Sequence, residues 1–371
     1  MVYLILVFIT AFVVVLYSTP ALIKVAILKN LIDSPEEDRK IHKRAVPTIG
    51  GIIIYAATLF SFSLWYNIEE IHELGLIEDS VKEFKILIAT SLVLFFVGVK
   101  DDIIGTAPVK KLFAHVVVGL ILILMGDIKI TGLHGVFGVE RIPEWGSIFL
   151  SLFTYIVVVN AMNLIDGVDG LAAGIGFIAT SFFGTWFVFG NELTLASLSF
   201  SLAGALLGFL VFNFSPAKIF MGDSGSLIIG MFIYVLSTKL IEYPVDFLDK
   251  FWVHISKPNL AIAALIYPLT DTLRIFIIRA LRGQSPFSAD RNHIHHRLID
   301  SGYSHVKTVI IIYVFSVATI GISLLSYYLD PSLSLVTVLG CSGSFILWVH
   351  FVFKKHSKNK KTSKKIVDQK I

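Results

Sequence analysis

Five short polar clusters interrupt a chain that is otherwise mostly apolar, and they hold the side chains that could do chemistry. Each contains at least one carboxylate, and several are bounded by glycine; they lie at residues 38–51, 100–102, 160–170, 213–226 and 285–296. Carboxylates brought together raise each other's pKa and repel, so a bound cation would best explain their convergence. Carboxylate oxygens suit Mg²⁺, with Mn²⁺ as the alternative, better than Zn²⁺.

The acids at the ends of apolar runs each have a structural alternative. Asp101 and Asp102 could simply mark a membrane interface, and on a helix they diverge by about 100°, so both serve one site only if the helix ends between them. Asp166 and Asp169 could cap a helix that begins near Gly170. Asp223 could cap the next helix, although a glycine-bounded helix start also offers free N–H groups as a phosphate cradle. We favour a functional role for all five acids.

The last cluster combines His293, His295 and His296 with flanking arginines. Because no Cys or Glu stands at a zinc-like spacing, we favour phosphate contacts over a zinc site. Asp271 and Arg274 lie three residues apart inside an apolar run, where they form either a functional site or a local ion pair.

Eleven apolar runs must position these clusters. The chain of 371 residues is 55% hydrophobic and only 16% charged, and about 20 apolar residues cross a bilayer. The runs lie near residues 1–23, 47–66, 84–100, 111–127, 146–163, 170–189, 193–212, 224–241, 258–278, 306–328 and 333–353. We therefore predict an all-α, polytopic integral membrane protein with about eleven transmembrane helices. The spacing of Gly204 and Gly208 indicates close helix packing.

Lysine and arginine are concentrated in alternate loops, at residues 24–46, 100–111, 213–223 and 279–307, and in the tail after Phe353. The positive-inside rule then predicts a cytoplasmic carboxyl terminus and an amino terminus outside. All five polar clusters fall on the cytoplasmic side. We expect one transmembrane domain over residues 1–353 and a basic cytoplasmic tail over residues 354–371, which anionic lipid attracts.

In this order, the five clusters resemble those of the polyprenyl-phosphate N-acetylhexosamine-1-phosphate transferase family. The superfamily also includes the phospho-N-acetylmuramoyl-pentapeptide transferase, and the resemblance covers roughly residues 1–330. The run from Arg282 to His296, which ends His-Ile-His-His, is similar to the hexosamine branch. The pentapeptide branch has a three-histidine run and usually ten spans.

The resemblance implies a role for each matched residue. Asp101 and Asp102 would lie beside the lipid-phosphate nucleophile, and Asp223 would hold Mg²⁺. The segment with Asn163, Asp166 and Asp169 would belong to the nucleotide and metal shell, and Phe220 would stack on uracil. The three histidines would lie near the diphosphate. Lys43 and Arg282 would contact phosphate.

The resemblance also implies the reaction. N-acetylhexosamine-1-phosphate, with GlcNAc as the favoured sugar, would pass from the UDP-sugar to undecaprenyl phosphate in the bacterial inner (plasma) membrane. UMP would be released, and a glycan such as O-antigen or teichoic acid would be initiated. The alternatives are the pentapeptide transferase and, in a different class, a membrane transporter. Nothing indicates nucleic acid as a partner, and the oligomeric state is open, a homodimer included.

Overall fold

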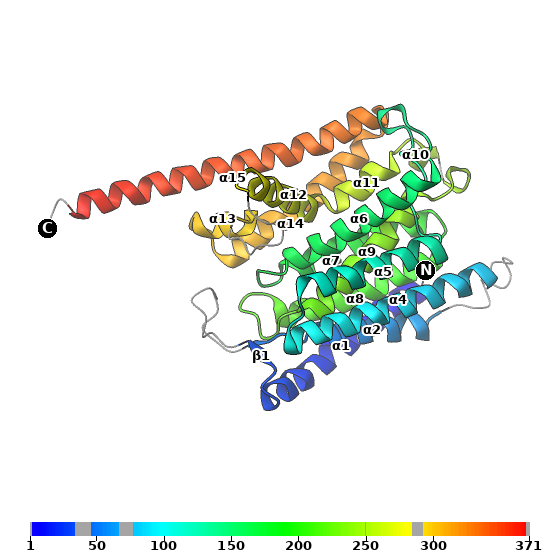
Figure 1. Cartoon of the computed structure of the whole chain (residues 1–371), viewed down its shortest axis with the longest axis horizontal. Helices are drawn as coiled ribbons and strands as arrows, with labels where there is room; N and C mark the ends of the chain where they lie inside the picture. Colours follow the sequence, from blue (N-terminus) through cyan, green and yellow to red (C-terminus); the bar gives the residue numbers. More distant parts are fainter. Residues whose placement is uncertain (1, 34–45, 67–76, 249, 284–291, 369–371) are drawn as a thin grey trace.

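The protein is a bundle in which most of the long helices run along one common direction and α12 (Ile266–Leu281) crosses it (Figure 1). The computed structural model describes residues 2–33, 46–66, 77–248, 250–283 and 292–368. Two-residue strands β1 (Ile32–Asp33) and β2 (Val46–Pro47) pair in antiparallel fashion. The remaining elements are α1 (Val2–Leu28), α2 (Gly51–Leu64), α4 (Ile77–Ile104), α5 (Pro108–Leu120), η1 (Ile121–Met125), η2 (Val136–Gly138), α6 (Glu144–Leu164), α7 (Leu171–Phe189), α8 (Leu193–Asn213), α9 (Asp223–Ile241), η3 (Val245–Phe247), α10 (Lys250–Val253), α11 (Lys257–Ala264), α12 (Ile266–Leu281), α13 (Ile294–Asp300), α14 (His305–Leu325), η4 (Ser326–Tyr328) and α15 (Pro331–Asp368). The predicted all-α, polytopic architecture is confirmed.

Each of the eleven predicted runs falls on a helix or a helix pair, but not every one has the form of a full span. Among the described residues, eight helices are long and apolar enough to cross a membrane, or nine if the bent pair α11 and α12 counts as one. Helix α2 has only 14 residues. In α4 the apolar stretch is flanked by Glu83, Lys85, Lys100 and the Asp101-Asp102 pair. The number eleven therefore stays a prediction.

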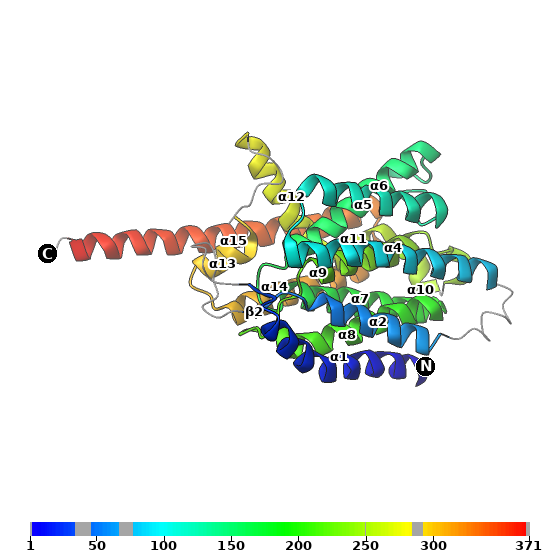
Figure 2. The same cartoon turned by 60° about the horizontal axis from the view of Figure 1, so that its bottom comes forward.

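Helices α11 and α12 meet at an angle of 75°. Pro268 lies in the first turn of α12 and has no N–H to donate, and its ring would clash with the carbonyl of Ala264, where α11 ends. The bend therefore follows from this proline. Asp271, Thr272 and Ile275 of α12 are still buried, and only the carboxyl-terminal end of α12 projects from the bundle (Figure 2).

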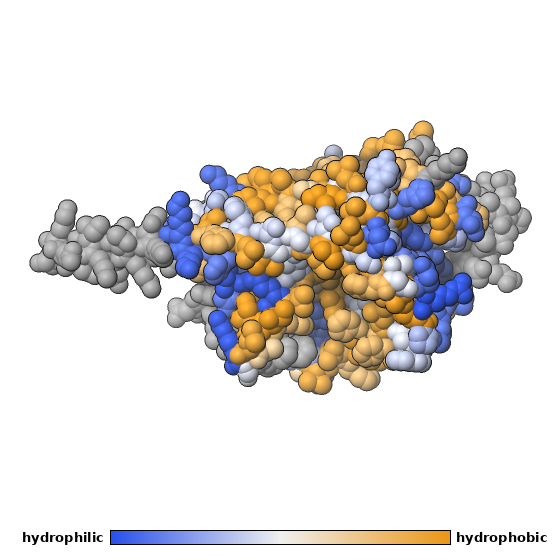
Figure 3. All heavy atoms as spheres, turned by 90° about the horizontal axis from the view of Figure 1, so that it is seen from above, coloured by the Kyte–Doolittle hydropathy of each residue, from blue (hydrophilic) through white to orange (hydrophobic). Residues whose placement is uncertain are grey.

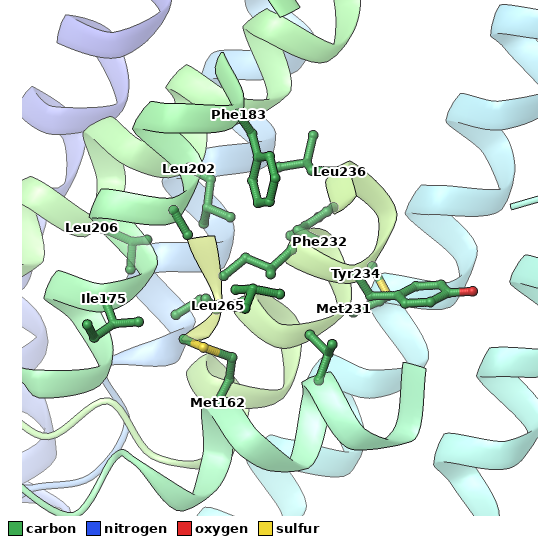
Figure 4. Packing of buried hydrophobic residues seen from close by; sticks show 14 of the residues in the cluster. Met162, Ile175, Phe183, Leu202, Leu206, Met231, Phe232, Tyr234, Leu236 and Leu265 are labelled. Atoms are coloured by element: carbon green, nitrogen blue, oxygen red, sulfur yellow. The ribbon is translucent and has the colours of Figure 1, made fainter. Parts of the chain in front are cut away.

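Helix α9 forms the centre of the bundle. Its most apolar 18-residue stretch is 94% buried, against 22% for α15. Side chains from α6, α7 and α8 pack around Met231, Phe232 and Leu236 of α9 (Figure 4). A helix that is apolar on all sides must be buried in this way, whereas the outer helices can leave one face to lipid.

On the face that Figure 3 shows, the middle of the molecule is mostly apolar, and hydrophilic residues gather toward the two ends. Phe96, Phe149 and Phe153 are among the large apolar side chains that remain exposed. Such a belt between polar ends is what a bilayer requires, so the chain is a multi-pass membrane protein.

The amino-terminal end of α1 and the carboxyl-terminal end of α15 lie at opposite ends of the molecule (Figure 1). Which end faces the cytoplasm stays a prediction from the lysine and arginine distribution. The predicted domain boundary at residue 353 falls inside α15, which continues to Asp368.

The close packing predicted for Gly204 and Gly208 is confirmed, and the partner is α1. A Cβ at Gly204 would lie 2.2 Å from the carbonyl oxygen of Phe8, and one at Gly208 would lie 2.8 Å from that of Phe12. Both positions therefore need glycine so that the α1 backbone can approach α8.

Gly204→Ala should lower the stability of the bundle by about 1–3 kcal/mol, because the added methyl group forces α1 and α8 apart. Gly340→Ala is the matched control, since a Cβ there meets nothing within 4 Å and alanine is the better helix former. Thermal unfolding in detergent should show a lower Tm for the first variant and an equal or higher Tm for the second. Equal Tm values for the two would contradict the packing argument.

Candidate active site

The start of α9 gathers charged side chains from several helices. Asn163, in the last turn of α6, donates from Nδ2 to Asp223 Oδ1 over 2.8 Å and to Ser226 Oγ over 2.9 Å. Lys111 of α5 forms an ion pair with Asp223, and its Nζ lies 3.3 Å from Asp101 Oδ2. The structure thus brings two of the predicted site residues, Asp101 of α4 and Asp223 of α9, to one ammonium group, and a third, Asn163 of α6, to Asp223.

The carboxylate of Asp102, a residue of α4, binds the N-terminal end of α9. Its Oδ1 accepts the backbone N–H of Asp223 over 2.7 Å, and its Oδ2 accepts that of Ser224 over 3.0 Å. The N-cap residue Gly222 has φ 72°, and a Cβ there would lie 2.7 Å from both Asp102 oxygens and 2.1 Å from the carbonyl oxygen of Thr48. Only glycine fits this turn, and a carboxylate at a helix N-terminus also complements the helix dipole.

Two expectations about these acids are wrong. Helix α4 continues to Ile104 rather than ending between Asp101 and Asp102. Both acids reach the site nevertheless, because one contacts Lys111 and the other contacts the α9 backbone. The α9 N-terminus is not a phosphate cradle, because Asp102 takes the N–H groups of Asp223 and Ser224, and that of Ser226 bonds to the Gly222 carbonyl. Asp223 makes no side-chain cap of its own helix, so that alternative is also wrong.

Asp166 adds a further carboxylate to this group. It lies between α6 and α7 and accepts a hydrogen bond from the backbone N–H of Gly222. Burial raises its pKa well above the usual range, and the charge of Asp102 adds to the rise. Asp102 lies past the apolar stretch of α4, and burial raises its pKa to about 6 against the opposing hydrogen bonds from Ser224. Both carboxylates lie against Gly222, since a Cβ there would meet Asp102 and the Gly222 N–H donates to Asp166.

Asp169 is buried behind these groups. Its Oδ2 accepts the backbone N–H of Ala217 over 3.0 Å, and nearby the Asn213 side chain accepts that of Gly170 over 3.0 Å. The two loops that lead into α7 and α9 are thereby joined. Helix α7 has Gly170 as its N-cap, without a side-chain cap bond, so the capping alternative for Asp166 and Asp169 is wrong.

The three histidines lie together at the start of α13. The ring centroids of His293 and His295 are 5.2 Å apart, and those of His295 and His296 are 4.4 Å apart. A Cβ on Gly167, the neighbour of Asp166, would lie 3.5 Å from His295 Nε2. His295 therefore lies beside the turn that carries Asp166. Burial lowers the pKa of His295 to about 3, so this ring is neutral.

Asp271 serves the histidine segment. One carboxylate oxygen lies 2.7 Å from His293 Nδ1, and the other accepts the N–H of Ile294 over 2.7 Å. Arg274 donates to the carbonyl oxygen of Asn292. Asp271, His293 and His295 offer ligand atoms within 4.8 Å of one another. Hydrogen-bond distances join Asp271 to His293 and Tyr267 to His295, so protein contacts hold all three side chains.

The other predicted binding residues have different outcomes. Phe220 stands two residues before Gly222. Its backbone pairs with the end of β2 and the residues after it, since its N–H donates to Pro47 and its carbonyl accepts from Gly50. Arg282 is exposed at the end of α12, in the part that leaves the bundle (Figure 2). Lys43 lies outside the described residues.

Sequence reasoning missed Lys111 and Tyr267 as members of these groups. A usable signal for Lys111 was its place in the first turn after Pro108, ten residues beyond Asp101. Tyr267, whose hydroxyl lies 3.1 Å from His295 Nδ1, gave no signal, because an aromatic residue in an apolar run is ordinary.

Residues 84–241 match the family described as glycosyl transferase family 4. The chain is 31% identical over 325 residues to the decaprenyl-phosphate N-acetylglucosaminephosphotransferase of Mycolicibacterium smegmatis, covering 84% of this chain and 79% of that protein. The chain belongs to glycosyl transferase family 4.

Other relatives in the family carry related names. The probable undecaprenyl-phosphate N-acetylglucosaminyl 1-phosphate transferase of Bacillus subtilis is 31% identical over 329 residues, covering 86% of this chain and 85% of that protein. The undecaprenyl-phosphate alpha-N-acetylglucosaminyl 1-phosphate transferase of Escherichia coli K12 is 28% identical over 313 residues, covering 82% and 79%. The family match spans every carboxylate around α9, whereas the three histidines lie beyond it.

Asp102→Asn should lower the free energy of unfolding of the protein by about 1–3 kcal/mol. A carboxamide can accept only one of the two backbone N–H groups and leaves the other buried without a partner. Asp101→Asn is the matched control, since Asp101 contacts a partly exposed lysine and should contribute about 1 kcal/mol or less. Thermal unfolding of both variants in detergent checks this. If Asp102→Asn were as stable as Asp101→Asn, Asp102 would not hold α9 in place.

Proposed function

We propose that the chain transfers GlcNAc-1-phosphate from UDP-GlcNAc to undecaprenyl phosphate, releases UMP and so initiates a cell-surface glycan. The observation that carries the proposal is the convergence of Asp101, Asp223, Asn163 and Lys111 at the start of α9. Family relatives named for GlcNAc-phosphate transfer to polyprenyl phosphates support it.

The rival functions have less support. The relatives reported above are named for N-acetylglucosamine rather than for the pentapeptide sugar, which favours the hexosamine branch. A transporter would place its ionisable residues near mid-membrane on broken helices. Here the carboxylates gather where α4, α6 and α9 end or begin.

The donor set fits Mg²⁺. Asp223 and Asp101 present carboxylate oxygens to one ammonium group, and Mg²⁺ is usually held by one or two carboxylates together with substrate phosphates. Asp223, assisted by Asp101, would hold the ion. Bound there, Mg²⁺ would neutralise charge on the diphosphate and on the departing UMP.

The reaction we propose is a direct displacement. An oxygen of the lipid phosphate attacks the β-phosphorus of UDP-GlcNAc, and the bond from that phosphorus to the bridging oxygen breaks as UMP leaves. A phosphate monoester has a second pKa of about 6, so the nucleophile is largely dianionic at pH 7 and needs little help from a base. This agrees with Asp102, both of whose oxygens already accept backbone N–H groups.

Charge neutralisation and positioning would then dominate, as in phosphoryl transfer generally. Lys111 would offset the charge of the two phosphates as they approach the carboxylates, and Asn163 would fix the rotamer of Asp223. We place the site on the cytoplasmic face of the plasma membrane, because lysine and arginine are concentrated in the loops at that end.

Asp223→Asn should lower kcat by about 10²–10³-fold or more, because a preorganised charge at the reacting phosphates is lost. The assay mixes purified protein, radiolabelled UDP-GlcNAc, undecaprenyl phosphate and Mg²⁺, and measures lipid-linked product and UMP. Asp246→Asn, an exposed acid in η3 near the other end of α9, should keep normal activity.

A wild-type protein that forms no lipid-linked product from UDP-GlcNAc would refute the proposed donor or acceptor. Donor exchange for the UDP-linked pentapeptide sugar tests the rival branch. Release of UMP in detergent, without any sealed compartment, excludes a transporter.

Lys111→Gln should lower kcat and raise the affinity for Mg²⁺. Without the ammonium group the two carboxylates attract a divalent ion more strongly, and repulsion of about 1–4 kcal/mol between charges ~4 Å apart is removed. The Mg²⁺ concentration that gives half-maximal activity should fall roughly tenfold. A higher requirement for Mg²⁺ in Lys111→Gln would show that Asp101 and Asp223 do not hold the ion.

A further inference from the structure

One face of α12 holds the segment that carries the histidines. Tyr267, Asp271 and Arg274 follow one another at spacings of four and three residues, so they share a helix face. Each contacts the segment before or within α13: Tyr267 contacts His295, Asp271 contacts His293 and the N–H of Ile294, and Arg274 contacts the carbonyl of Asn292. We call these three residues the α12 clamp.

Asp271 is the central member of the clamp. It is fully buried, and its two oxygens are used separately, one by a ring nitrogen and one by a backbone N–H, each over 2.7 Å. A buried carboxylate inside an apolar helix is costly, and a packing role alone could be served by an apolar side chain. The cost of burying this carboxylate is explained if its charge fixes the protonation and orientation of the His293 ring.

An ionised carboxylate only accepts hydrogen bonds, so the contact makes His293 Nδ1 the protonated ring nitrogen. The tautomer and the orientation of an imidazole are commonly fixed in this way by the group bonded to its other nitrogen. Nε2 is then the ring atom that can face a ligand. His293 stacks on His295, which in turn adjoins Gly167 beside Asp166.

We propose that Asp271 is a positioning residue for the transfer reaction: it acts through His293, whose tautomer and ring orientation it fixes, and it holds the histidine segment against the 166–169 turn. This inference rests on the proposed function for its activity measurements. It assigns a role to a carboxylate that lies outside the group around α9.

Asp271→Asn separates this role from a structural one. Asparagine keeps the size and one acceptor for the Ile294 N–H, but its NH₂ group would donate to Nδ1 and so favour the opposite tautomer. We expect kcat to fall about 10–100-fold, the range typical of such supporting contacts, with KM for UDP-GlcNAc nearly unchanged. Asp271→Ala should lose activity and also Tm, because it leaves the Ile294 N–H without its acceptor.

Thr270→Val is the matched control on the same helix. It removes the 2.7 Å hydrogen bond between Thr270 Oγ1 and Ser342 Oγ without touching the clamp, and it should keep normal kcat. A double-mutant cycle gives the sharper result. If Asp271 acts through His293, the variant with both Asp271→Asn and His293→Ala should be no slower than His293→Ala alone.

Normal kcat in Asp271→Asn, or losses that multiply in the double variant, would overturn the proposal. A tautomer measurement needs no Asp271 variant: in ¹⁵N-histidine spectra of the wild-type protein, the signal missing from His293→Ala should report a protonated Nδ1. An unprotonated Nδ1 would overturn the proposal even if Asp271→Asn did not fold. The proposal would also be overturned if the wild-type protein bound one equivalent of a transition metal and His293→Ala did not.

The two hypotheses fail in different ways. If the wild-type protein makes no lipid-linked product, the proposed function fails, whereas the ¹⁵N measurement still decides the state of His293. If the wild-type protein is active and Asp271→Asn is as fast, only the role of Asp271 fails.

Discussion

The hydrogen bonds from the start of α9 to Asp102 support both the core and the candidate site. Helix α9 is the most deeply buried of the candidate spans, so its first N–H groups need a partner from the protein, and an unpaired one would cost about 1–3 kcal/mol. Asp102 of α4 supplies that partner. The same two bonds fix where α9 begins and therefore where Asp223 stands. A single contact between helices thus sets the position of the proposed metal ligand.

The loops around this contact are tied down in the same way. The backbone after β2 pairs with the segment that leads into α9, through Gly50, Gly51 and Phe220. Asp169 and Asn213 join that segment to the loop before α7. Irregular backbone at membrane depth is tolerated only where protein groups satisfy it. The polar side chains at this end therefore have two roles. Some form hydrogen bonds with backbone N–H and C=O groups, and others place charge at the candidate site.

The helices could be predicted well from sequence, because each of the eleven apolar runs became a helix or a helix pair. The length of α2 and the charged flanks of α4 kept those two from having the form of full spans. The residues of the site could be named from their types, but their partners could not. Asp102 and Asp101 are adjacent in sequence, yet one bonds to backbone and the other to Lys111, and only the packing of α4 against α5 and α9 decides which.

The same distinction separates the acids by the chemistry left to them. Asp102, Asp166 and Asp169 each accept a hydrogen bond from at least one backbone N–H, so their charges are largely committed to the fold. Asp101 and Asp223 instead face an ammonium group, and a cation in that position can be exchanged for another. A site for a divalent ion and two phosphates needs oxygens of the second kind. The acids that accept backbone N–H groups explain why so many carboxylates lie near the start of α9, although one or two would suffice for the metal.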